Sequence, residues 1–121
     1  MVNIASLLSG AGVVVFSTLN QVHDMISGTT AGQAAVLKVY TQGCGHSQRM
    51  AQPFADLKVK YTSVSFFGID GMPVQGLTGE LDIKGFPTFI GYACGKEAGR
   101  VIGSDSDGLE NLVMKLKDVK C

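Results

Sequence analysis

The chain has 121 residues, of which 45% are hydrophobic, and this fits one domain with one core rather than two. Its ten basic and ten acidic side chains cancel, and no basic cluster stands out, so nothing in the charge pattern favours nucleic acid as a partner. Before Lys38 the only charged side chain is Asp24, so we expect the N-terminal region to be buried or docked.

The apolar run 4–16 is interrupted by Ser and Gly, is too short to span a bilayer and lacks the basic start of a secretory signal. We therefore expect a soluble protein that docks on a membrane at most peripherally, through this segment. The compartment stays open, because the mature form of an organellar protein, with its targeting segment removed, has the same appearance. We divide the chain into an apolar N-terminal extension, 1–11, and a single domain, 12–121.

The first elements of the domain are expected to be a short buried strand over 12–17, a helix that begins at Thr18 and ends near Gly28, and a second strand over 35–41. The strands are continuous apolar runs rich in Val, and the helix has apolar residues at helical spacing. Unbroken apolar strands indicate burial on both faces of a sheet.

A helix over 44–60 follows, bent by Pro53 and with an inward stripe formed by Met50, Phe54 and Leu57. Next come a strand over 61–69 and a short helix over 73–82.

Strands over 86–92 and 99–102 flank a hairpin turn, and a last helix covers 105–119 behind an Asp105 cap. The order β-α-β-α-β-α-β-β-α predicts an α/β fold, with a central mixed sheet of about five strands flanked by about four helices.

The three cysteines, Cys44, Cys94 and Cys121, have no paired spacing typical of metal ligands, so we predict neither a metal site nor a disulfide framework. An odd number leaves at least one thiol free or paired outside the chain. Cys94 and Cys121 are most simply surface thiols, and a disulfide or partner role is the alternative.

Three segments, in their order along the chain, form a recognisable pattern. Cys44-Gly45-His46-Ser47-Gln48-Arg49-Met50-Ala51 comes first, Ile83-Lys84-Gly85-Phe86-Pro87-Thr88 follows, and Gly95-Lys96-Glu97 with Arg100-Val101-Ile102-Gly103 comes last. Together they resemble the thioredoxin superfamily, most closely the domains of protein disulfide isomerases, whose motif is Cys-Gly-His-Cys. The resemblance implies a thioredoxin fold. It also implies that Pro87 is cis and lies beside Cys44, and that Phe86, Pro87 and Thr88 bind an extended peptide substrate.

The sequence departs from that pattern at the site itself. Ser47 replaces the second cysteine, Gly43 the preceding tryptophan, and Lys38 the buried acid six residues before the nucleophile, while Pro53 lies one place later than the family's proline. Each departure removes part of a two-thiol mechanism.

The remaining residues still favour a reactive thiol. A cysteine at a helix N-terminus meets the positive end of the helix dipole, which favours the thiolate. A protonated His46 and the Ser47 hydroxyl act in the same direction. Lys38 either points under the site, where it stabilises the thiolate, or faces solvent, and the sequence does not decide between these.

We therefore predict that Cys44, with His46 and Ser47, captures partner proteins through their thiols and is released by glutathione or another external thiol, as a monothiol disulfide oxidoreductase with no other cofactor. One alternative is a redox-inactive thioredoxin-like subunit or adaptor of a larger assembly, docked through Ile4–Leu8. A weaker one is iron–sulfur binding, as in monothiol glutaredoxins. A further alternative is that Ser47 is an engineered replacement of cysteine in a dithiol isomerase-like enzyme. Lys38 and Gly43 argue against this, because such a replacement does not require them.

Overall fold

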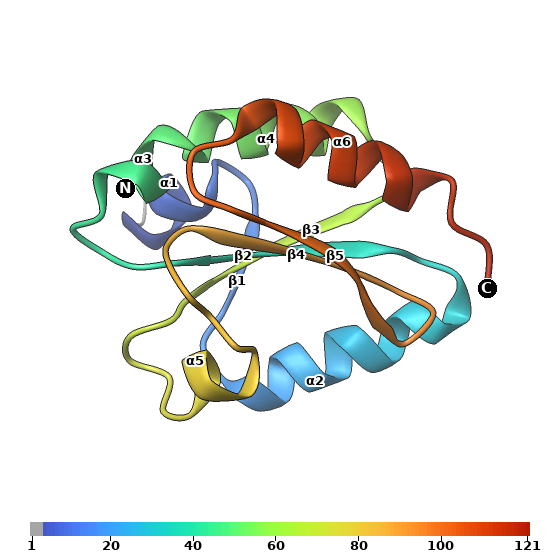
Figure 1. Ribbon diagram of the computed structural model, residues 1–121, viewed down its shortest axis with the longest axis horizontal. Coiled ribbons are helices and arrows are strands. Elements are labelled where there is room, and N and C mark those ends of the chain that lie inside the picture. The colour runs from blue at the N-terminus through green and yellow to red at the C-terminus, as the bar shows by residue number, and fades with distance from the viewer. Residues whose placement is uncertain (1–3) are drawn as a thin grey trace.

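Strand β2 (Ala35–Tyr40) is the centre of a five-stranded sheet in the computed structural model, which describes residues 4–121 (Figure 1). The strand order is β1-β3-β2-β4-β5, in which β1 (Val14–Phe16), β3 (Ser65–Asp70) and β2 run parallel. β4 (Thr88–Ala93) and β5 (Lys96–Ile102) are antiparallel to their neighbours. All six residues of β2 are buried, as its unbroken apolar sequence predicts.

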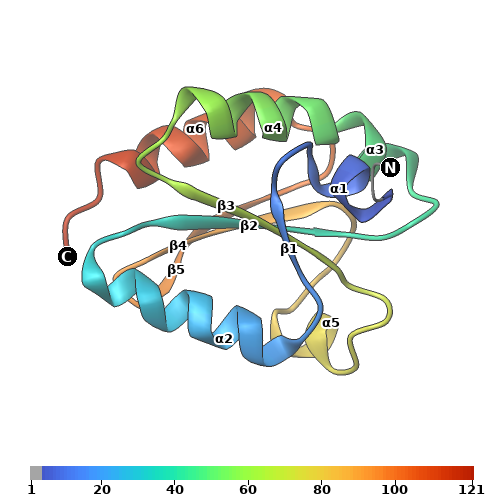
Figure 2. The same ribbon diagram turned by 180° about the vertical axis from the view of Figure 1, so that it is seen from behind.

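Helices cover both faces of the sheet (Figures 1 and 2). α4 (Ala51–Lys60) and α6 (Ser106–Lys117) lie on one face, and α2 (Leu19–Gly28), the short η1 (Thr29–Ala31) and α5 (Leu77–Glu80) lie on the other. Each face carries its own core, and alternate residues of β2 enter one or the other: Val36 joins the α4/α6 core, while Leu37 and Val39 join the α2/α5 core. The predicted thioredoxin fold with a five-stranded mixed sheet is confirmed.

Helix α1 (Ile4–Ser9) packs against α3 (Gly45–Arg49), α4 and the adjacent strands. Leu8 and Ser9 are buried there, within the segment we separate as an extension. Gly68 on β3 makes this approach possible, because a Cβ at that position would lie 2.5 Å from the Ser9 Cβ. The extension is thus packed on the domain from Ile4 onward, and its residues 1–3 lie outside the described part of the chain.

Several predicted boundaries are wrong, among them that of β5, which begins at Lys96 rather than at residue 99. The helix over 44–60 is two helices, α3 and α4, separated at Met50. Pro53 explains the break, because it has no N–H to donate to the carbonyl of Arg49 and its ring crowds that carbonyl. β3 begins at Ser65 rather than at Tyr61, and the helix over 73–82 is only the single turn of α5.

Local signals in the sequence hold elsewhere. Thr18 and Gln21 form a reciprocal capping box at the start of α2, with the Thr18 Oγ1 accepting from the Gln21 N–H at 3.2 Å. Asp105 caps α6 by accepting from the Gly108 N–H at 2.9 Å. The predicted inward stripe is buried at each of its three positions, Met50, Phe54 and Leu57.

Cys94 and Cys121 form a disulfide across 27 residues, so the expectation of two surface thiols is wrong. The bond ties the C-terminal tail to the β4–β5 turn, at the end of the sheet remote from α3 (Figure 1). Among the described residues Cys44 is then the one free cysteine. In the part of the chain described here, no helix has both the length and the apolar character needed to cross a membrane.

Candidate active site at the start of helix α3

Cys44 is the N-cap residue of α3, with extended backbone angles (φ −93°, ψ 112°). The chain reaches it from β2 through a short loop in which Gly43 takes a φ of +81°, a conformation that glycine adopts without strain. The Cys44 thiol is half-buried and donates to the carbonyl oxygen of Phe86 at 3.7 Å. The Phe86–Pro87 peptide bond is cis, and Thr88 begins β4 directly after it. The segment Phe86–Thr88 and the sulfur thus meet at one end of the central strands β2 and β4.

The surroundings of the sulfur favour the thiolate. Desolvation alone raises the pKa of the Cys44 thiol. Hydrogen bonds from the N–H and hydroxyl of Ser47 and from the N–H of His46 lower it, as does the charge of Arg49. Together these lowering effects are larger, so the net shift of the pKa is downward. These backbone donors are the unpaired N–H groups of the first helical turn. The predicted acidic character of Cys44 therefore has a local structural cause.

Ser47 is fully buried beneath the sulfur. Its hydroxyl has no hydrogen-bond partner among the described atoms while Cys44 is a thiol, and it remains free to donate to a thiolate, which is how it lowers the pKa of Cys44. Its carbonyl oxygen points the other way and accepts from the Lys38 ammonium at 2.7 Å. Ser47 thus contacts Cys44 on one side and Lys38 on the other.

His46 is exposed in the first turn of α3. Its Nδ1 receives a hydrogen bond from the Arg49 guanidinium and lies 3.0 Å from the Ser104 hydroxyl. The charge that lowers the pKa of the Cys44 thiol from α3 is that of Arg49, a residue with no role in the sequence-based prediction.

Lys38 is completely buried, which decides the alternative left open by the sequence. Both faces of β2 are covered, so no solvent-facing position exists on that strand. The ammonium donates to the main-chain carbonyls of Leu8 on α1 and of Ser47 on α3, and it lies 5.8 Å from the centre of the Tyr40 ring. Desolvation lowers the pKa of Lys38 from 10.5 to about 7, and a thiolate at Cys44 raises it in opposition. The amine therefore lies under the active-site helix and responds to the charge of the sulfur.

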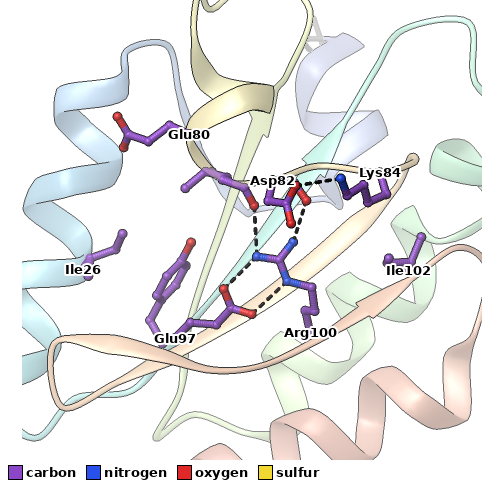
Figure 3. A pocket seen from close by; sticks show the side chains of 9 residues that line it. Ile26, Glu80, Asp82, Lys84, Glu97, Arg100 and Ile102 are labelled. Atoms are coloured by element: carbon purple, nitrogen blue, oxygen red, sulfur yellow. Dashed lines mark hydrogen bonds and ion pairs between the residues drawn. The ribbon is translucent and has the colours of Figure 1, made fainter.

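Arg100 braces the segment that leads to Pro87 (Figure 3). From β5 it makes a double hydrogen bond to Glu97, at 2.7 and 2.8 Å, and donates to the carbonyls of Leu81 and Asp82, both at 3.0 Å. It lines a hollow of about 470 Å³ between α5, α2 and the hairpin. Its guanidinium is therefore occupied by the protein itself, and it fixes the turn after α5 from which the chain runs to the sulfur.

Contacts link most of the residues predicted for the site: Cys44 contacts the Phe86 carbonyl and Ser47, and the Ser47 carbonyl accepts from Lys38. Pro87 and Thr88 follow Phe86 directly in the chain, and His46 is exposed in the first turn of α3. Arg49 and the Leu8 carbonyl also belong to the site and are absent from the sequence-based prediction. The basic position after the motif is the available signal for Arg49, whereas a main-chain carbonyl has no sequence signal. The described residues contain no group of three His, Cys, Asp or Glu side chains that could hold a metal ion.

Comparison with known proteins agrees with the fold. The family model for thioredoxin matches residues 14–115. Thioredoxin H5 of Arabidopsis thaliana is 26% identical over 110 residues, which is 89% of this chain and 93% of that protein. A thioredoxin-like protein of Acanthamoeba polyphaga mimivirus is 27% identical over 100 residues, 81% of this chain and 72% of the relative.

Solved structures give the same result. The thioredoxin NaTrxh of Nicotiana alata superposes with a TM-score of 0.80 at 26% identity, covering 88% of this chain and 93% of that one. A mitochondrial thioredoxin of Saccharomyces cerevisiae, in its oxidised form, superposes with a TM-score of 0.79 at 21% identity, covering 85% and 94% of the two chains, and at that identity shows likeness of fold alone.

Proposed function

This chain belongs to the thioredoxin family, and on that premise we propose that Cys44 exchanges disulfides with partner proteins as a single thiol. The observation that carries the proposal is the isolation of this thiol. It is the one free cysteine of the described residues, it caps a helix beside a cis peptide bond, and a serine occupies the position beneath it. An acidic thiol in such a place is a nucleophile.

The exchange has two steps. The Cys44 thiolate attacks one sulfur of a partner's disulfide, so a mixed disulfide forms and the other sulfur leaves as a thiolate. Because Ser47 cannot attack that bond, an external thiol of the glutathione class attacks the partner's sulfur and Cys44 leaves as a thiolate. The external thiol ends in a disulfide with the partner, so every bond and electron pair is accounted for.

The segment at Phe86–Thr88 is the proposed docking strand for the partner. Its carbonyl at Phe86 accepts from the Cys44 thiol at 3.7 Å, so a peptide paired with this backbone carries its own sulfur close to the nucleophile. The Cys-Gly-His pattern, similar to that of protein disulfide isomerase domains, supports disulfides of folding or folded proteins as the substrate class.

The test is reaction of the purified chain with glutathione disulfide, followed by mass spectrometry, with Cys44→Ala as control. We expect one glutathione on Cys44, removed by reduced glutathione, and an alkylation midpoint at lower pH than that of the same cysteine in the denatured chain. Since Cys94 and Cys121 are paired, they cannot act as thiol controls. A Cys44 that forms no adduct in the folded protein overturns the proposal and leaves a redox-inactive thioredoxin-like subunit.

Ser47→Cys is the sharper variant, because it replaces a buried hydroxyl that already contacts the sulfur with a second thiol. In this variant the mixed disulfide should collapse to an internal disulfide between Cys44 and the introduced thiol, and the glutathione should leave without any added thiol. Retention of the adduct in Ser47→Cys contradicts the single-thiol explanation.

A further inference from the structure

Lys38 occupies a site that can hold either of its protonation states. Its nitrogen donates to two main-chain carbonyls, those of Leu8 and Ser47. A neutral amine has two N–H groups, and these carbonyls accept from both, whereas an ammonium has a third N–H. That third donor has no hydrogen-bond partner among the described residues, and the π-face of Tyr40 and the sulfur at the start of α3 are what compensates its charge.

No carboxylate neutralises this amine among the residues that the structure describes. α1 contains no charged residue, and the residues opposite Lys38 in the sheet are Gly68 on β3 and Phe89 on β4. The charge of Asp70, at the end of β3, acts on the Tyr40 hydroxyl. From α3, Arg49 lies at the exposed surface and adds positive charge. The Cys44 sulfur is therefore the one group, within the described range, whose negative charge supports a charged Lys38.

We propose that Lys38 and Cys44 share one proton, and that this proton leaves the pair when Cys44 enters a mixed disulfide. The inference rests on the proposed function and concerns regulation of the same site. It makes Lys38 a positioning residue that acts on Cys44 across Ser47, whose carbonyl holds the amine and whose N–H and hydroxyl contact the sulfur.

The proton balance of the exchange follows. The resting pair is thiolate with ammonium, or thiol with amine, and both carry one proton and no net charge. Capture converts the sulfur to an uncharged disulfide and expels a partner thiolate. Lys38 has then lost its counter-charge in a buried site, so it becomes a neutral amine and its proton ends on the expelled thiolate. When an external thiol resolves the mixed disulfide, the proton lost by that thiol returns to the pair.

A charged lysine thus serves a single-thiol mechanism in a way that a buried carboxylate does not. A carboxylate beside Cys44 disfavours the thiolate by like-charge repulsion, and its use is to take a proton from a second thiol. Ser47 removes that second thiol, so the remaining requirement is to stabilise one thiolate and to keep the buried site uncharged in both states. Lys38 meets both requirements.

The experiment uses the intact chain labelled with [ε-¹³C]lysine, with the Cys94–Cys121 disulfide kept oxidised. The titration midpoint of Lys38 is measured by NMR with Cys44 free and after Cys44 has been thiomethylated with methyl methanethiosulfonate, a small neutral cap. We expect the Lys38 midpoint to fall by about one pH unit or more on capping, the effect of losing a nearby opposite charge. The exposed Lys96 and Lys120 are internal controls, and capping of Cys44 should not move their NMR signals.

The outcomes separate the two proposals. If capping leaves the Lys38 midpoint where it was, the groups titrate independently and the shared proton is overturned, although Cys44 is still reactive. If Cys44 resists capping, the proposed function fails, and Cys44→Ala then removes the sulfur without chemistry. A lowered Lys38 midpoint in Cys44→Ala supports the coupling, and an unchanged one overturns it.

A second variant tests the effect on the sulfur. Lys38→Met should move the alkylation profile of Cys44 to higher pH, whereas Lys96→Met, a lysine-to-methionine change at the remote hairpin, should not. Equal profiles in both variants contradict the coupling.

Discussion

Breaking the Cys94–Cys121 disulfide should cost the protein a definite amount of stability without disturbing the active site. The bond closes a loop across 27 residues. In the chain-entropy treatment such a cross-link restricts the unfolded chain by roughly 12 cal/mol/K, or about 3.5 kcal/mol at 25 °C. Cys121→Ala is the cleaner change, because Cys94 has a φ of 56° in the β4–β5 turn and its replacement alters the turn as well.

The assay is urea unfolding of the Cys44→Ala chain, in which only the remote sulfurs respond to reductant. The free energy of unfolding of the oxidised form should be about 3.5 kcal/mol larger than that of its reduced form. It should exceed that of the Cys44→Ala, Cys121→Ala double variant by the same amount. Hydrogen exchange should rise in the tail after α6 and in the β4–β5 turn, but not in β2. If the oxidised and reduced forms differ by less than about 1 kcal/mol, restriction of the unfolded chain is the wrong account of this bond.

Three further outcomes can be checked. Because the pKa of Lys38 is lowered from 10.5 to about 7, the unfolded chain binds the extra proton between these values, so the free energy of unfolding should rise with pH across that window, by at most about 5 kcal/mol. Equilibrium unfolding of wild type and Lys38→Met from pH 7 to 9.5 should show this slope only in the wild type, and equal slopes exclude Lys38 as its source. Gly68→Ala should destabilise the fold by about 1–3 kcal/mol in denaturant unfolding, since its Cβ would lie 2.5 Å from the Ser9 Cβ, and Ser9→Gly should restore most of that loss. If Ser9→Gly restores nothing, the clash with α1 is not the cause. Arg100→Ala should slow the capture of glutathione disulfide while leaving the alkylation profile of Cys44 unchanged, because the guanidinium holds the carbonyls of Leu81 and Asp82 and does not touch the sulfur. A shifted alkylation profile in Arg100→Ala contradicts that separation.

Much of the fold can be predicted from the sequence because its signals are local. Apolar runs such as β2 indicate strands covered on both faces, and the caps at Thr18 and Asp105 mark helix starts that the structure reproduces. The break at Met50 has a local cause as well, but Pro53 acts on the carbonyl four residues earlier, and whether a proline bends or separates a helix depends on what packs around it.

The site is predictable in its residues and less so in their roles. The motif places Cys44, His46 and Ser47 together, but the contact between the Arg49 guanidinium and the His46 ring depends on side-chain rotamers. The sequence does not decide whether Lys38 points under the site or faces solvent, because a single charged residue in an otherwise apolar strand forms no alternating pattern that would identify an exposed face. The burial of β2 on both faces resolves it only when the strand is known to be central.

The pairing of Cys94 with Cys121 could not be deduced from spacing, because three cysteines permit three pairings. The partner of Cys94 is set by the route of the tail after α6, which runs past the end of the sheet to the β4–β5 turn (Figure 1).

The two cations near Cys44 differ in their access to mobile ions. Lys38 is enclosed, whereas Arg49 lies at the surface, where at 0.1 M salt counterions weaken charges over about 10 Å. Ionic strength therefore separates their contributions. As salt is added, the share of thiolate stabilisation that comes from Arg49 should fade, whereas the hydrogen bonds from Ser47 and His46 and the proposed contribution of Lys38 should persist. The pKa of the Cys44 thiol should accordingly stay low at high ionic strength.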